Sequence, residues 1–144
     1  MNEKRVGVRI LITIFFVITP ILCTAQTIRD YNPVNEQRML EPEPENWLMF
    51  RRTYDGWGYS PLAQIDAENV GDLTPVWAFS TGVPEGHQAP PIVNDGVMFI
   101  TPPGAQVYAL DARTGEQLWR YRRQLPVDLM QTHPPNRGVG LFED

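Results

Sequence analysis

Apolar and polar positions alternate in the second half of the chain, in four short runs that turn residues separate. The runs are residues 91–93, 97–101, 106–110 and 116–121. A period of two is typical of half-buried β-strands. Asn94-Asp95-Gly96 links the first two runs and is a strong hairpin signal, because Asp-Gly tolerates the positive φ of a tight turn. The sequence therefore predicts a four-stranded antiparallel meander.

Upstream of residue 90 the pattern is less regular. Residues 76–79 (VWAF) predict one more strand. Asp66 is placed to cap a short helix that extends to Leu73, and Pro75 ends this helix. Residues 46–50 (NWLMF) form the first apolar cluster that can dock on a core.

Residues 26–45 are polar and end in the acidic, proline-containing run 41–45 (EPEPE). Pro42 and Pro44 disfavour a helix, and the neighbouring carboxylates repel one another. We expect an extended lead-in on the surface, followed by a folded unit over residues 46–144.

The predicted fold class is all-β. A four-stranded antiparallel meander is the unit of a β-propeller blade. The same local pattern fits a β-sandwich, so periodicity alone leaves both architectures open.

The first 25 residues predict a secretory signal peptide. Lys4, Arg5 and Arg9 precede an uncharged apolar stretch over 10–22, and Cys23-Thr24-Ala25 provides small residues at the cleavage site. The stretch of about 13 residues is about 20 Å long as a helix, at ~1.5 Å per residue. This is less than the ~30 Å of a bilayer core, so we expect export to the periplasm with cleavage after Ala25.

Two other interpretations of this leader stay open. An uncleaved anchor could use the uncharged residues 10–28. Cys23 could carry a lipid, although Leu22 before it is bulkier than the small residue that lipid attachment normally requires. The apolar length favours cleavage.

Charge and cysteine content exclude several classes of protein. Cleavage removes three basic side chains and Glu3, so the net charge falls from −5 to −7. Nucleic acid is a poor partner for such a surface, because binding depends on Lys and Arg that neutralise phosphates. Cys23 is the only cysteine, which excludes a zinc finger or a disulfide scaffold.

A motif resolves the choice between propeller and sandwich. Residues 109–119 (ALDARTGEQLW) resemble the tryptophan-docking repeat A-x-D-x-x-T-G-x-x-x-W of quinoprotein propellers. Asp111 can accept turn amide hydrogens, Gly115 permits a positive φ, and Ala109 leaves space for an indole ring. The resemblance implies that Trp119 lies across a neighbouring blade, where an aromatic side chain buries about 150–250 Å².

Two further stretches extend the resemblance over residues 46–144. They are residues 59–77, from Tyr59-Ser60-Pro61-Leu62 to Trp77, and residues 125–139, which include Asn136-Arg137-Gly138-Val139. The chain resembles the N-terminal part of a pyrroloquinoline quinone (PQQ)-dependent alcohol dehydrogenase of the methanol/ethanol dehydrogenase type. This implies a partial eight-bladed β-propeller with about one to two blades, since a blade takes ~40–45 residues.

The family's chemistry is implied only through this resemblance. Its members oxidise an alcohol by hydride transfer to PQQ beside a calcium or lanthanide ion, and pass electrons to a periplasmic cytochrome c or a membrane quinone. The metal ligands and catalytic residues come from later blades. We therefore expect no catalytic residue and no metal ligand in this chain, which alone is expected to be inactive.

Three residues match cofactor-contacting positions of the family. Arg137 matches an arginine at the quinone oxygens, where a guanidinium offers fixed donors. Gln88 stands where the family usually has a glutamate, and Pro135 falls at another contact position. The loop over 131–135 (QTHPP) lacks the two adjacent cysteines of many relatives, so His133 or the paired prolines could cover the quinone instead.

The preferred functional hypothesis is a fragment of a periplasmic PQQ-dependent dehydrogenase. A non-catalytic propeller, such as an outer-membrane assembly protein, is an alternative that uses the same docking repeat. A pseudoenzyme is another, because Gln88 replaces the glutamate and the cysteines are absent. The sequence does not identify the substrate or the metal.

Overall fold

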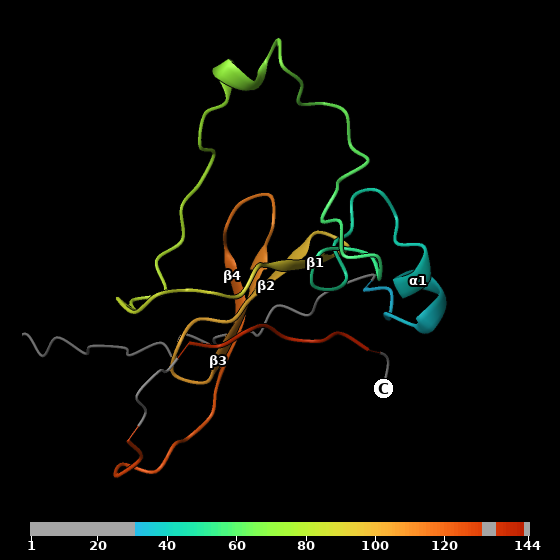
Figure 1. Cartoon of the computed structure of the whole chain (residues 1–144). Coiled ribbons are helices and arrows are strands. Elements are labelled where there is room, and N and C mark those ends of the chain that lie inside the picture. The colour runs from blue at the N-terminus through green and yellow to red at the C-terminus, as the bar shows by residue number, and fades with distance from the viewer. Residues whose placement is uncertain (1–30, 131–134, 143–144) are drawn as a thin grey trace, which may run out of the picture.

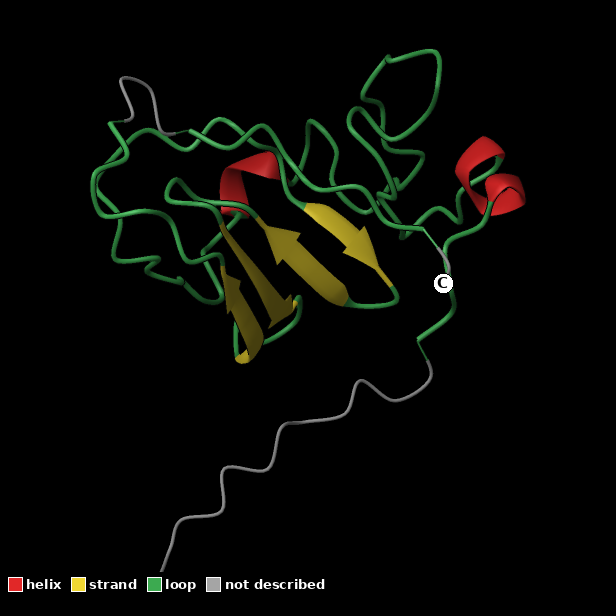
Figure 2. Ribbon diagram, turned by 90° about the horizontal axis from the view of Figure 1, so that it is seen from below, coloured by secondary structure: helices red, strands yellow, loops and turns green. Residues whose placement is uncertain are grey.

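A computed structural model describes residues 31–130 and 135–142, and its centre is one four-stranded sheet. The strands are β1 (Ile92–Asn94), β2 (Val97–Ile100), β3 (Gln106–Asp111) and β4 (Gln117–Arg122). They lie in the order β1-β2-β3-β4, and each pair is antiparallel (Figures 1 and 2). The predicted meander is confirmed, with strand ends within one residue of those expected.

The turn between β1 and β2 has the predicted geometry. Asp95 and Gly96 have φ values of 47° and 77°. Two consecutive positive φ angles are the requirement of a type I′ hairpin turn, whose twist matches that of the strands. The local sequence therefore sets the register, in which Asn94 pairs with Val97.

The two faces of the sheet pack against different segments. On one face, Phe99, Ala109 and Trp119 are cross-strand neighbours, and Val139 and Leu141 from the C-terminal segment pack against this cluster. Because side chains alternate along a strand, Tyr108 and Leu110 point to the opposite face. Both faces of β3 are buried.

The lead-in is not wholly extended as predicted. Helix α1 (Glu36–Leu40) interrupts it, with Asn35 as N-cap whose side-chain oxygen accepts a hydrogen bond of 3.0 Å from the Arg38 amide. The prolines at 42 and 44 lie beyond the helix and do not oppose it. Val34, at the start of this segment, is 1% exposed.

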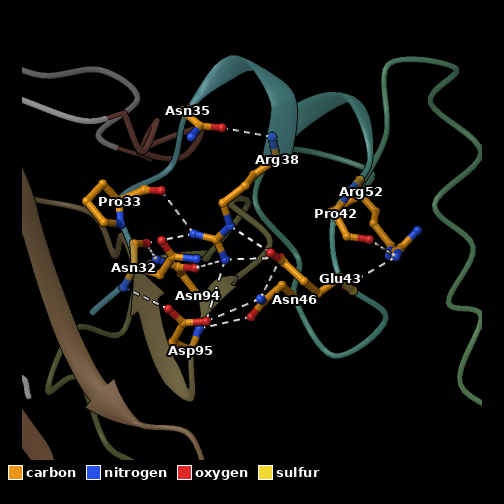
Figure 3. Close-up of polar contacts among 10 residues, drawn as sticks. All are labelled: Asn32, Pro33, Asn35, Arg38, Pro42, Glu43, Asn46, Arg52, Asn94 and Asp95. Carbon is orange, nitrogen blue, oxygen red and sulfur yellow. Dashed lines mark hydrogen bonds and ion pairs between the residues drawn. The ribbon is translucent and has the colours of Figure 1, made fainter. Parts of the chain in front are cut away.

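A buried cluster around Arg38 explains why this segment folds (Figure 3). The guanidinium donates to both carboxylate oxygens of Glu43 at 2.8 and 3.0 Å and to the side chain of Asn94, in β1, at 2.9 Å. It also donates to the carbonyl oxygens of Asn32 and Pro33. The hydrogen bond from Arg38 holds the pKa of Glu43 well below its usual value, at about 2.

The predicted helix from Asp66 to Leu73 is wrong in length. The Asp66 side chain does accept from the amides of residues 68 and 69, as a cap should. Only the 3₁₀ turn η1 (Val70–Asp72) follows. Val70 and Leu73 are 52% and 58% exposed, and a short helix without tertiary packing is marginal in water.

The predicted strand at 76–79 is also wrong. This stretch is extended and alternates, with Trp77 and Phe79 half-buried and Val76 91% exposed. However, within the described ranges the backbone of residues 74–80 makes no hydrogen bond to another strand. We call residues 58–81 the arm: they leave the sheet and return to it, with η1 far from the strands (Figure 1).

Candidate functional site

The turn between β3 and β4 has the geometry that the docking motif predicts. The Asp111 carboxylate accepts from the amides of Arg113 at 2.9 Å and Thr114 at 2.8 Å. These backbone hydrogen bonds, with that of Thr114 the stronger, lower the pKa of Asp111. Gly115 has a φ of 74°. The predicted roles of Asp111 and Gly115 are confirmed.

Trp77 from the arm packs on this turn, a contact that the sequence pattern did not predict. A Cβ atom at Gly115 would lie 2.5 Å from Trp77 Cε3, so only glycine admits the indole ring this closely. Trp77 Nε1 also donates to the carbonyl oxygen of Ala112 at 3.2 Å. The sequence does contain a signal for this contact: Trp77 and Trp119 are 42 residues apart, which is about the length of one blade, ~40–45 residues.

Trp119 has a different environment. Its ring centroid lies 6.0 Å from that of Phe99, and the side chain is 38% exposed. It lines an apolar groove of about 470 Å³ together with Tyr121 and Val139. Its predicted contact with a neighbouring blade stays a prediction.

Several loops meet at the end of the sheet where β2 ends and β3 begins. A polar cleft of about 420 Å³ is lined by residues 82–85, residues 103 and 104, Gln106, Arg122 and Leu129. The Arg123 amide donates to the Ala105 carbonyl oxygen at 3.0 Å. The cleft therefore joins the loop before β1, the β2–β3 turn and the segment after β4.

Gln88 lies in the first of these loops and its side chain is exposed. Its neighbours His87 and Ala89 line a second cleft, of about 700 Å³, with residues 79–84 and the end of β2. His87 Nε2 is 3.0 Å from Thr81 Oγ1 across the loop. Among the described residues the Gln88 side chain makes no hydrogen bond, and it lies between two residues that line this cleft.

Arg137 lies in the C-terminal segment and is exposed. The Asn136 side-chain oxygen accepts from the Gly138 amide at 3.1 Å and shapes the turn that presents the guanidinium. Pro135 is half-buried two residues before it. His133 lies outside the described residues.

The described structure does not bring Gln88 and Arg137 into contact. The loop of Gln88 is attached to the face of the sheet that carries Tyr108, and the segment of Arg137 packs on the face that carries Phe99. Within residues 31–130 and 135–142 no hydrogen bond or ion pair links the two. Their common role at one cofactor stays a prediction.

The chain has clear relatives of known family. The family model described as glucose/ethanol/alcohol dehydrogenase, β-propeller domain, matches residues 47–144. The quinoprotein alcohol dehydrogenase PedH of Pseudomonas putida is 41% identical over 112 residues, which are 75% of this chain and 19% of that protein. The quinohemoprotein alcohol dehydrogenase ADH-IIG of Pseudomonas putida is 48% identical over 84 residues, 58% of this chain and 12% of that protein.

A solved structure is similar as well. The quinohemoprotein alcohol dehydrogenase from Comamonas testosteroni matches with a TM-score of 0.61 and 34% identity, over 67% of this chain and 15% of that one. The chain therefore spans less than a fifth of the length of each of these three relatives. In the described part of the chain, no helix has the length and apolarity that a membrane crossing requires.

Proposed function

The chain belongs to the PQQ-dependent glucose/ethanol/alcohol dehydrogenase family of β-propellers, and from this premise we propose that it is the N-terminal part of a periplasmic quinoprotein that oxidises an alcohol. The family match over residues 47–144 carries the proposal. The meander and its glycine-centred docking turn support it, because a four-stranded antiparallel meander is the unit of a propeller blade and Trp77 packs on its turn.

The exposed polar side chains fit the proposed cofactor. PQQ is a planar quinone with three carboxylates, so it needs hydrogen-bond donors and cations. Gln88 offers an amide and Arg137 a guanidinium, and both are exposed. Pro135 would add apolar contact beside Arg137. When bound, the quinone supplies the two-electron acceptor that takes up the substrate hydride.

The remaining parts of the proposal concern groups outside the described residues. We propose that a calcium or lanthanide ion assists the reaction, with ligands from other blades. The proposed electron acceptor is a periplasmic cytochrome c or a membrane quinone. Export rests on the leader, and N-terminal sequencing of periplasmic material should begin at Gln26; an intact Met1 in a membrane fraction would favour the anchor instead.

A chimera tests the proposed function directly. Residues 47–144 would replace the matched segment of the Pseudomonas putida quinohemoprotein alcohol dehydrogenase, and the product would be titrated with PQQ in the presence of calcium. We expect quinone binding and alcohol-dependent reduction of an acceptor dye. A folded chimera that binds no quinone would support the non-catalytic propeller or pseudoenzyme instead.

Variants of the chimera test the individual residues. Arg137→Ala removes charge-assisted hydrogen bonds of ~1.5–3 kcal/mol each, so quinone affinity or turnover should fall about 10- to 150-fold at ~1.4 kcal/mol per decade. Arg137→Lys should restore only part, because an ammonium lacks the planar fork. If the Gln88 amide is an adaptation to the altered loop over 131–135, Gln88→Glu should weaken binding through repulsion of the cofactor carboxylates. If Arg137→Ala binds like the parent, Arg137 does not contact the quinone.

A further inference from the structure

The loop that carries Gln88 is closed by a single hydroxyl group. Thr81 Oγ1 lies 3.0 Å from His87 Nε2, six residues further along, and also accepts from the Val83 amide at 3.3 Å. The hydroxyl therefore joins the start of the loop to its end.

The same threonine is attached to the sheet. The Tyr108 hydroxyl lies 3.4 Å from the Thr81 carbonyl oxygen and 3.4 Å from Gln106 Oε1. The Phe79 ring packs edge-on against Tyr108, with 5.3 Å between the centroids. Tyr108 is only 3% exposed, and thus a buried strand residue fixes one end of the loop.

Gln88 directly follows His87 and has no such support of its own. Among the described residues its side chain makes no hydrogen bond, and it is exposed to solvent. Its two neighbours, His87 and Ala89, line the cleft of about 700 Å³, and its own position depends on the loop backbone, which the Thr81–His87 contact closes. We propose that Thr81 and His87 are positioning residues that hold Gln88 at the cofactor, with Tyr108 as their anchor.

This inference rests on the proposed function, because it assigns the loop to the quinone site. It goes further in naming residues that act through Gln88. Without the bridge, the loop would lose conformational restraint and binding would have to order it again. A neutral hydrogen bond at the surface contributes modestly, so we expect quinone affinity to fall about 3- to 10-fold when it is removed.

The experiment uses the chimera of residues 47–144 and PQQ as the probe. Thr81→Val keeps the side-chain shape and removes the hydroxyl, His87→Ala removes the ring, and the double variant completes a cycle. Thr81→Val also removes the acceptor of the Val83 amide, so the double variant should bind no more weakly than Thr81→Val alone. His87→Gln, whose amide can still reach the hydroxyl, should restore part of the affinity. Thr53→Val, which removes an exposed hydroxyl bonded to Asp55 in another loop, should bind like the parent.

Two readouts separate positioning from general destabilisation. In a Gln88→Ala background, His87→Ala should cause no further loss of affinity, whereas a merely structural defect would still lower it. Hydrogen exchange on the 144-residue chain, without quinone, should show faster exchange of amides 82–88 in Thr81→Val and His87→Ala.

The outcomes are distinguishable. If the parent chimera binds quinone and the bridge variants bind it equally, the inference is wrong and the proposed function stands. The inference is equally wrong if amides 82–88 exchange unchanged, or if His87→Ala still lowers affinity without Gln88. If the parent binds no quinone at all, the proposed function fails and the inference fails with it.

Discussion

The N-terminal segment over residues 31–52 and the arm over residues 58–81 both pack beside the same sheet. Neither contributes one of its four strands. In the N-terminal segment, Val34 and Leu48 are each 1% exposed. Polar groups of this segment and of β1 accept hydrogen bonds from the Arg38 guanidinium. The arm touches the sheet through Trp77, Phe79 and Thr81 only at its end. Large apolar side chains along it, such as Leu73 and Val76, are exposed.

The difference shows which segment finds its packing and hydrogen-bond partners within the described residues. A buried guanidinium is tolerated only when its donors are satisfied, and Arg38 meets that condition with partners in the N-terminal segment and with Asn94 in β1. Exposed apolar residues in an extended, unpaired stretch lack the contacts that bury them. We therefore expect the packing of the arm to depend on other blades of the proposed propeller.

The largest expected effect is on the N-terminal segment. Arg38→Met should remove the guanidinium donor of Glu43 and Asn94. Among the described residues, Glu43 then keeps only the Asn46 side-chain amide as a donor. Removal of one partner of a buried ion pair costs ~3–5 kcal/mol, but the Glu43 side chain is 37% exposed and water relieves part of this. We expect a loss of about 2–3 kcal/mol in the free energy of unfolding, measured with urea.

A double variant is the control for this prediction. Arg38→Met with Glu43→Gln removes the unpaired charge and should recover part of the lost stability. A loss below ~0.5 kcal/mol in Arg38→Met, typical of ordinary surface changes, would mean that the cluster does not hold the segment.

The junction between arm and sheet should be nearly as sensitive. Gly115→Ala places an L side chain at a φ of 74°, which costs ~1–2 kcal/mol. Its Cβ would also lie 2.5 Å from Trp77. We expect a loss of about 2–3 kcal/mol and faster amide exchange in residues 74–81.

Gly71→Ala is the matched control inside the arm. A Cβ there meets no atom within 4 Å. Alanine also restricts the unfolded chain, so this variant should equal the parent or gain up to ~1 kcal/mol. If Gly71→Ala and Gly115→Ala lowered the free energy of unfolding equally, the contact between Trp77 and Gly115 would not be specific.

Acid should weaken the N-terminal segment through Glu43. Its pKa is lowered from 4.5 to about 2 by the hydrogen bond from Arg38. A lowered folded-state pKa stabilises the fold fully above pH 4.5, and this contribution is lost as the pH falls towards 2. Between about pH 5 and pH 3, urea midpoints should drop more for the parent than for Glu43→Gln, and equal drops would contradict the prediction.

The meander was predictable because its information is local. Asn94-Asp95-Gly96 and residues 112–115 define tight turns, and alternation between them sets the faces. The helix α1 was missed because its stability comes from Arg38, whose partner Asn94 is 56 residues away. Residues 76–79 alternate like a strand, but a strand also needs a neighbouring edge, which a pattern of side chains cannot supply.

The candidate site was predictable only in part. The turn chemistry of Asp111 and Gly115 follows from a contiguous motif. The contact between Thr81 and His87 depends on the path of a loop. The contact between Trp77 and Gly115 joins two residues that are 38 positions apart in the sequence. The joint role of Gln88 and Arg137 comes from the family resemblance alone, since in the described residues their segments are attached to opposite faces of the sheet.

The smallest expected effect on stability is that of a substitution in the arm, and it tests the difference between the arm and the N-terminal segment most directly. Val76 is 91% exposed, so Val76→Ser should change the free energy of unfolding of the whole chain by less than ~0.5 kcal/mol. In the chimera, the other blades should cover this side chain, and burial of a valine contributes ~1.5–3 kcal/mol. We expect Val76→Ser to cost the chimera about 1 kcal/mol or more, measured as urea unfolding beside the Gly71→Ala control. Equal sensitivity in both backgrounds would mean that the arm stays exposed in the propeller, and its apolar residues would then need another explanation.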